Sequence, residues 1–261
     1  MLSVTSAQLD AWLVALMFPL ARILGLISAA PLLSNRAIPT RFRLTIGLAV
    51  ALAVLPALPP IPPIAADSWM ALGILLHQVL IGVAIGFMMR LFFAAIDLAG
   101  EMIGLQMGLS FAVFFSPQTG GQSSVVAQFL NLLTLLVFLA LDGHLMLIKI
   151  VVLSFEWLPI GEATASEGWL LIVRHASVMF ASGVLIALPM VAALLITNIA
   201  LGVLTRAAPQ LNLFAVGFPV TLSIGFLVLF VSLSYLGPVF HGLFERGFEA
   251  IDLLLRALKP G

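Results

Sequence analysis

The sequence has 261 residues, of which 62% are hydrophobic and only 8% are charged. A soluble domain averages about 45–50% apolar and about 25% charged residues, so too few polar side chains remain here to cover a soluble surface. The composition therefore predicts an integral membrane protein. The net charge is zero, which gives no reason to expect nucleic acid as a partner. The absence of cysteine excludes disulfides, thiol catalysis and cysteine-ligated metals.

The first apolar segment, Ala11–Ser34, is interrupted by Arg22 and Pro19. Its end resembles a signal-peptide cleavage site, but no Lys or Arg precedes it, as a signal peptide requires. We therefore expect a retained helix. Short loops rich in Lys and Arg tend to stay cytoplasmic, which predicts that the amino terminus lies outside. The arginines behind this prediction are Arg36, Arg41 and Arg43.

The second segment begins near Leu44 and ends in a proline-rich stretch, which predicts an extended connector because proline cannot continue a helix. The third runs from Ser68 to Gly108 without a clear break. A helix of that length would measure about 60 Å, whereas a bilayer span needs only about 20 residues. Either the segment breaks near Arg90, or it is a long helix that is not confined to the membrane.

Glycines recur at every fourth position in this third segment, a spacing that allows close helix packing but also arises by chance in glycine-rich membrane proteins. One pair is Gly82 and Gly86, and a second row consists of Gly100, Gly104 and Gly108. The same segment contains Arg90, Asp97 and Glu101. Each would cost about 2.5–3.5 kcal/mol at the centre of a lipid-facing helix, so we expect all three to face protein or water.

Asp97 and Glu101 lie four residues apart on one helix face, where like charges repel. One of them should have a basic partner or a raised pKa. Structural pairing inside a bundle and a proton relay are both compatible with this pattern. Phe111, Phe114 and Phe115 then follow at helical spacing, which taken alone is more typical of packing than of function. They are followed in the sequence by three residues that favour irregular backbone, Pro117, Gly120 and Gly121.

The next span, Ser123–Leu141, leads into Asp142-Gly143-His144, which is only a weak metal or acid–base motif and otherwise a turn. A polar, acidic connector at 154–168 follows and predicts a boundary between two halves. Residues 169–240 form an apolar helical hairpin, with prolines in both arms that predict kinks. Residues 241–261 form an amphipathic tail that we expect to lie along an interface or against a partner.

Several blocks of this chain carry a resemblance to a known family. They are PLLSNRAIPTRFR, GEMIGLQMGLSFAVFF, LDGHLMLI and ALPMVAALLITNIALGVLTRAAPQLNLFAVGFPVTL. With them the chain resembles the family of the flagellar biosynthetic protein FliR, which has a counterpart in injectisome type III secretion. The likeness extends from Pro19 to about Leu229.

The resemblance implies a subunit of the gate that exports unfolded flagellar proteins, in the bacterial inner membrane and the flagellar basal body, with part of the complex on the periplasmic side. The implied partners are FliP-like and FliQ-like subunits, and an FlhB-like subunit at the entrance. The implied fold is all-α, with about six long hydrophobic segments. A FliP-like part at 1–153 precedes the connector and a FliQ-like hairpin at 169–240. The cytoplasmic turn of that hairpin contains Arg206, Pro209, Gln210 and Asn212.

In the family, the loop after the GLQMGLSFA block plugs the pore. Carried over here, the plug is about residues 106–122, with the three phenylalanines as its apolar mass and with Asp97 and Glu101 anchoring its supporting helix. Many relatives carry an acid where this chain has Ser116, so no charge-dependent role is assigned there.

The sequence has no nucleophile–base pairing, phosphate-binding glycine loop or metal cluster, so we expect neither enzymatic activity nor a cofactor. The hypothesis is a gated conduit sealed by apolar side chains through dewetting. One alternative is a small secondary transporter that uses buried acids in broken helices. The other is a purely structural nucleus for assembly.

Overall fold

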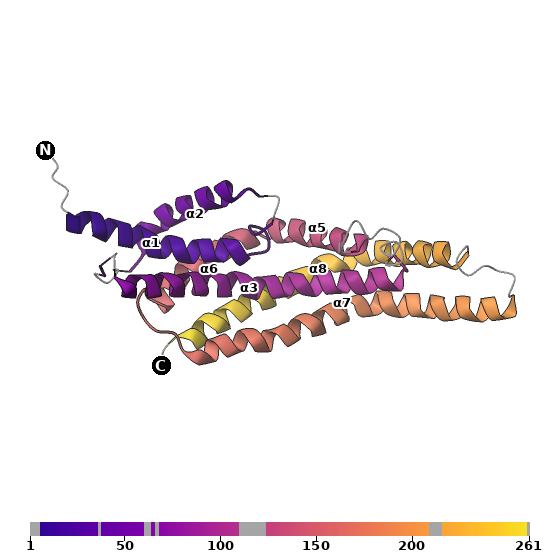
Figure 1. Cartoon of the computed structure of the whole chain (residues 1–261). Coiled ribbons are helices and arrows are strands. Elements are labelled where there is room, and N and C mark those ends of the chain that lie inside the picture. The colour runs from indigo at the N-terminus through magenta and orange to yellow at the C-terminus, as the bar shows by residue number, and fades with distance from the viewer. Residues whose placement is uncertain are drawn as a thin grey trace. The chain divides into compact units, whose positions relative to one another are not determined.

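The computed structural model describes residues 6–35, 38–59, 64–65, 68–109, 124–208 and 216–259. These residues are almost entirely helical, which confirms the predicted all-α class (Figure 1). In chain order the elements are α1 (Ser6–Ala29), α2 (Thr40–Val54), the 3₁₀ turn η1 (Leu55–Ala57), α3 (Trp69–Gln106), α5 (Val125–Ala140), α6 (Gly143–Trp157), α7 (Ser166–Ala207) and α8 (Phe218–Leu258).

Helix α3 is continuous at Arg90, where the sequence left open whether the segment breaks. It runs for 38 residues without a break, and Arg90 lies on its exposed surface. At 1.5 Å per residue its length is about 57 Å, well beyond a simple span. Helices α7 and α8 are longer still, at 42 and 41 residues.

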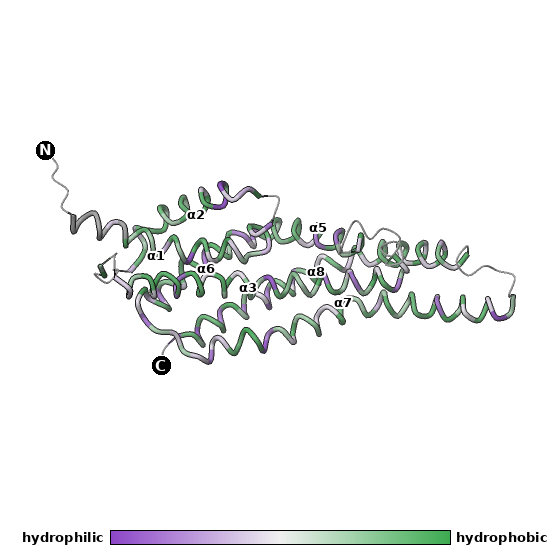
Figure 2. Tube along the Cα trace, in the orientation of Figure 1, coloured by the Kyte–Doolittle hydropathy of each residue, from purple (hydrophilic) through white to green (hydrophobic). Residues whose placement is uncertain are grey.

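Hydrophobic residues predominate along the helices that Figure 2 colours by hydropathy. Among the described residues, four helices are long and apolar enough to cross a membrane: Thr40–Ala57, Trp69–Gln106, Ser166–Ala207 and Val216–Leu258. A fifth span results if the pair α5 and α6, bent by 64°, counts as one. The described residues therefore form a polytopic helical membrane protein with four or five candidate spans, where about six long hydrophobic segments were expected.

The chain divides into two compact units, each made of segments that are separate in the sequence. Unit 1 consists of Met1–Leu91, Asp142–His175 and Glu245–Gly261, and unit 2 of Phe92–Leu141 and Ala176–Phe244. The acidic connector thus belongs to unit 1. Its range includes the end of α6 at Trp157 and the start of α7 at Ser166.

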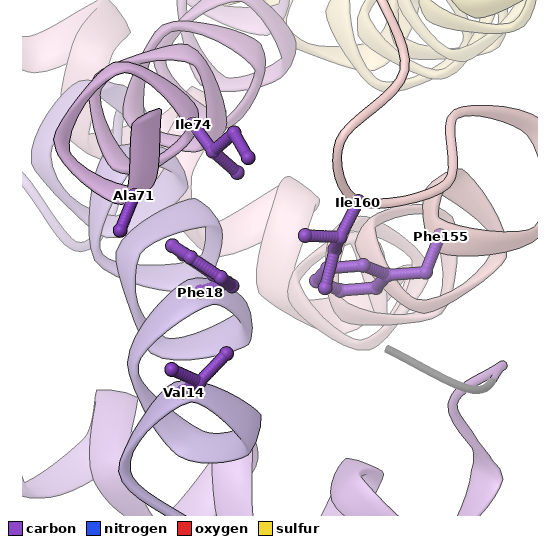
Figure 3. Close-up of a cluster of buried hydrophobic side chains, with 6 residues drawn as sticks. All are labelled: Val14, Phe18, Ala71, Ile74, Phe155 and Ile160. Atoms are coloured by element: carbon purple, nitrogen blue, oxygen red, sulfur yellow. The ribbon is translucent and has the colours of Figure 1, made fainter. Parts of the chain in front are cut away.

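In unit 1, helices α1 and α3 approach each other backbone to backbone. A Cβ added at Gly82 would lie 1.9 Å from the carbonyl oxygen of Arg22, and one at Gly86 would lie 2.8 Å from the amide nitrogen of Ala30. No side chain fits at such distances, so the close packing predicted for this glycine pair is confirmed, with α1 as the partner. An apolar cluster extends the contact to α6 and the residues after it (Figure 3). Its buried members are Val14, Phe18, Ala71, Ile74, Phe155 and Ile160.

The predicted amphipathic tail is the last part of α8, not a separate helix. Its apolar residues Ile251, Leu254 and Leu258 are fully buried within the chain. Leu258 also accepts a backbone hydrogen bond from Ala165 N at 3.0 Å. This apolar face is therefore covered by the chain itself.

In unit 2, three aromatic rings pack between α3, α5 and α8. The ring centroids of Phe93, Phe138 and Phe244 lie 5.1 to 5.4 Å apart. Helix α7 comes close to α3 at Gly183, where an added Cβ would lie 2.7 Å from the carbonyl oxygen of Ala95. These contacts hold the second half of α3 in place, and α3 is the helix that carries the acids.

Candidate functional site: the junction of α3 and α5

Helix α3 ends at a glycine. Gly108 has a φ of 83°, in the left-handed region that stops a helix, and Leu109 N donates back to Gly104 O at 3.0 Å. The sequence assigned Gly108 to the packing row. In the structure it lies beyond the last helical residue, Gln106, and ends the helix instead.

Helix α5 begins at Ser124, whose side chain caps it. The Ser124 hydroxyl oxygen accepts from Ala127 N at 3.1 Å, as the N-cap residue of a helix commonly does. The same hydroxyl donates to the carbonyl oxygen of Gly100 on α3 at 3.2 Å. One serine therefore both starts α5 and fastens it to α3.

Glu101 makes the second contact at this junction. Its Oε1 accepts a hydrogen bond from Ser124 N at 2.7 Å, so the carboxylate sits at the amino terminus of α5. The first N–H groups of a helix have no partner within it, and that end carries a partial positive charge. Among the described residues, the partner of Glu101 is therefore a helix amino terminus, whereas the sequence suggested a basic side chain for one of the two acids.

Asp97 and the two glycines complete the junction. Asn131 Nδ2 of α5 donates to Asp97 Oδ1. A Cβ added at Gly100 would lie 2.4 Å from Ala127 Cα, and one at Gly104 would lie 2.6 Å from Ser124 Oγ. The positions on α3 are 97, 100, 101 and 104, which share one helix face. The charges that lipid would reject and the glycines that allow close approach therefore meet the same partner, α5.

The sequence did not single out Ser124 or Asn131. A serine directly before an apolar helical run is an N-cap signal that could have identified the first. Asn131 has no such signal, since an amide inside an apolar helix indicates a polar contact without naming its partner.

The predicted plug lies almost wholly outside the described residues. Phe111, Phe114, Phe115, Pro117, Gly120 and Gly121 are all in 110–123, and the structure describes only the two helix ends that flank this segment. Of the predicted turn, Arg206 is exposed in the last turn of α7, while Pro209, Gln210 and Asn212 lie outside the described residues.

Asp142-Gly143-His144 forms the bend between α5 and α6. Asp142 adopts a left-handed conformation with a φ of 54°, and its carbonyl oxygen accepts from Leu145 N at 2.9 Å. Within the described part of the chain, no three His, Cys, Asp or Glu side chains gather as a metal site would require. The motif is a turn in this structure.

Long apolar helices with acids turned toward a neighbouring helix define a polytopic membrane protein. A sequence profile of the family described as bacterial export proteins, family 1, matches residues 13–247. The chain is 42% identical over 259 residues, 99% of each protein, to the flagellar biosynthetic protein FliR of Escherichia coli K12. It is 29% identical over 238 residues to the protein of the same name in Bacillus subtilis 168, covering 90% of this chain and 92% of that protein. The chain belongs to this family of bacterial export proteins, as the resemblance of its sequence blocks implied.

Proposed function

We propose that this chain is a subunit of the flagellar protein export gate, in the bacterial inner membrane, and that its segment 106–122 closes the export pore. Membership of a bacterial export family and close similarity to proteins named for flagellar biosynthesis support the first part. FliP-like and FliQ-like subunits would form the pore with it, and an FlhB-like subunit would border the entrance. The exported substrates would be unfolded flagellar proteins.

The observation that carries the plug proposal is the junction of α3 and α5. Through Gly100, Glu101 and Ser124, α3 is bonded to the start of α5, and these two helices flank an uncharged, phenylalanine-containing segment. A segment held at both ends can leave and re-enter a pore without releasing its helices. Apolar side chains in a narrow pore exclude water and ions by dewetting.

The apolar surfaces of the hairpin support the partners. Only 17% of the spanning window in α7 and 22% of that in α8 is buried within the chain. Large apolar residues such as Ile196, Val203 and Phe230 are more than half exposed. Surfaces of this kind must be covered by lipid or by other subunits.

The first experiment tests assembly. The tagged chain is expressed with and without its FliP-like and FliQ-like partners, purified in mild detergent and weighed by native mass spectrometry. We expect a defined hetero-oligomer with one copy of this chain. A lone monomer or homodimer that the partners leave unchanged would contradict the gate, and substrate uptake by the purified chain alone would favour a transporter instead.

The second experiment tests the seal in the assembled complex. Substituting Phe111, Phe114 and Phe115 together by serine should raise the leakage of small ions across the membrane. The matched control is Phe42→Ser, a phenylalanine that is 63% exposed on α2 and lies outside the segment. Unchanged permeability in the triple variant would refute the plug and leave a structural role in assembly.

A further inference from the structure

Arg22 is a charged side chain with no exposed surface, and the proposed export function does not use it. It lies on α1, in unit 1, next to the backbone crossing with α3. Burying a charge is unfavourable unless other groups compensate it. The structure shows how that compensation is made.

The guanidinium has five N–H groups, and the structure gives it five hydrogen bonds. Nε and Nη2 both donate to Gln78 Oε1 on α3. Nη1 donates to Ser154 O at 2.8 Å and Ser154 Oγ at 3.0 Å, and Nη2 donates to Leu158 O at 2.8 Å. The guanidinium carbon also lies 4.0 Å from the centre of the Phe155 ring.

These acceptors are neutral, but they are not arbitrary. Ser154 lies in the last turn of α6, and Leu158 is its C-cap residue. Leu158 O is one of the last carbonyl groups of α6, which have no partner within a helix, and that end carries a partial negative charge. Ser154 O already accepts from Leu158 N at 2.9 Å and takes the bond from Arg22 in addition. The end of α6 therefore takes the place of a counterion, and no carboxylate pairs with Arg22 in the described part of the chain.

Gln78 in turn has only Arg22 as a hydrogen-bond partner of its side-chain amide among the described residues. The Gln78 side chain is fully buried, and its Nε2 has no hydrogen-bond partner among the described residues. The two bonds from Arg22 are therefore what orients this amide. Arg22 thus connects three helices that are far apart in the sequence.

We propose that Arg22 is a positioning residue that docks α1 onto the rest of unit 1 only after both α3 and the end of α6 are in place. Alone in lipid, α1 would expose a guanidinium without acceptors, which is unfavourable. Once α3 supplies Gln78 and α6 supplies its terminal carbonyls, every donor is met. The amino-terminal helix can therefore dock only after α6 has formed. Arg22 and Ser154 are 132 positions apart in the sequence.

The test measures amide hydrogen exchange in the full chain in mild detergent by mass spectrometry. We expect Gln78→Leu to lower protection in α1 and in the last turn of α6 on the order of tenfold, because a buried cation loses the acceptor of two N–H groups. Arg22→Lys should lower the protection in the same way, since a single ammonium on α1 cannot bond both Gln78 of α3 and the end of α6. The double variant R22M/Q78L should regain much of the protection, because removing both polar partners leaves an apolar contact.

Arg90→Met is the matched control, an arginine of the same unit that is exposed on α3. It should change no protection in α1. The proposal is overturned if α1 stays protected in Gln78→Leu, or if protection falls equally in all helices. It is also overturned if the double variant loses as much protection in α1 as the two single variants together. Should Gln78→Leu fail to fold, a folded double variant supports the proposal and an unfolded one refutes it.

Discussion

Replacing Gly104 with alanine tests whether the close contact of α3 with Ser124 holds the start of α5. The added Cβ would lie 2.6 Å from Ser124 Oγ and 2.8 Å from Ser124 Cβ, whereas ordinary contacts are 3.4–4 Å. Either α5 moves away from α3, or the serine rotates and gives up its hydrogen bonds to Ala127 N and Gly100 O. Both responses weaken the junction.

The magnitude follows from three contributions. Overpacking a close contact costs about 1–3 kcal/mol, and losing a serine N-cap costs about 1 kcal/mol. Alanine gains about 1 kcal/mol over glycine inside a helix, which offsets part of the loss. The net destabilisation is therefore about 2 kcal/mol, which for a protein of this size lowers the melting temperature by about 4–8 °C. Thermal unfolding in mild detergent, followed by circular dichroism, measures it.

Two further variants separate packing from helix propensity. Gly73→Ala lies on the same helix, with nothing within 4 Å of the added Cβ. It should raise the melting temperature by a few degrees, since only the propensity of about 0.5–1 kcal/mol remains. The double variant G104A/S124G removes the clash, and glycine replaces a serine cap at a cost of only a few tenths of a kcal/mol. A Gly104→Ala variant as stable as Gly73→Ala, or additive effects in the double variant, would refute the reasoning.

Two more predictions concern the same helix. Gly82→Ala should cost about 3 kcal/mol or more in the same unfolding assay, because its Cβ would meet the Arg22 carbonyl oxygen at 1.9 Å and a backbone atom cannot rotate aside; a stability equal to that of Gly73→Ala would contradict this. Glu101→Ala should lower the protection of the first turn of α5 against hydrogen exchange by about 1–3 kcal/mol, since the half-buried Ser124 N–H loses its charged acceptor. Glu101→Gln keeps an oxygen acceptor and should lose less, and equal protection in both variants would rule out this role for the carboxylate.

The fate of Asp97 and Glu101 shows what the sequence could and could not predict. The cost of burying an acid in lipid is a property of the residue itself, so their turning toward protein was predictable. Their partners were not. Glu101 accepts from the backbone N–H of Ser124, and almost every residue carries such a donor. Only the position of a helix end makes that N–H available, and this position is a tertiary fact.

The acidic connector shows a different limit. Its composition indicated a boundary between halves, because polar residues are typical of exposed linkers. In the structure it also makes hydrogen bonds within unit 1. Thr164 Oγ1 lies 3.0 Å from His77 Nε2 and accepts from Trp169 Nε1 at 3.2 Å. Composition reports exposure to solvent, whereas a unit boundary depends on contacts between distant segments.

The length of the segment between the two helix ends bears on how a plug could work. Residues 110–123 span at most about 3.3–3.6 Å each, or roughly 50 Å when fully extended. Because its two ends are attached to α3 and α5, its middle can lie no more than about half of that, roughly 25 Å, from the nearer attachment point. Under the proposed function this length limits how far the segment could extend into the pore. The junction of α3 and α5 would then set where the segment can act, while its phenylalanines would determine what it excludes.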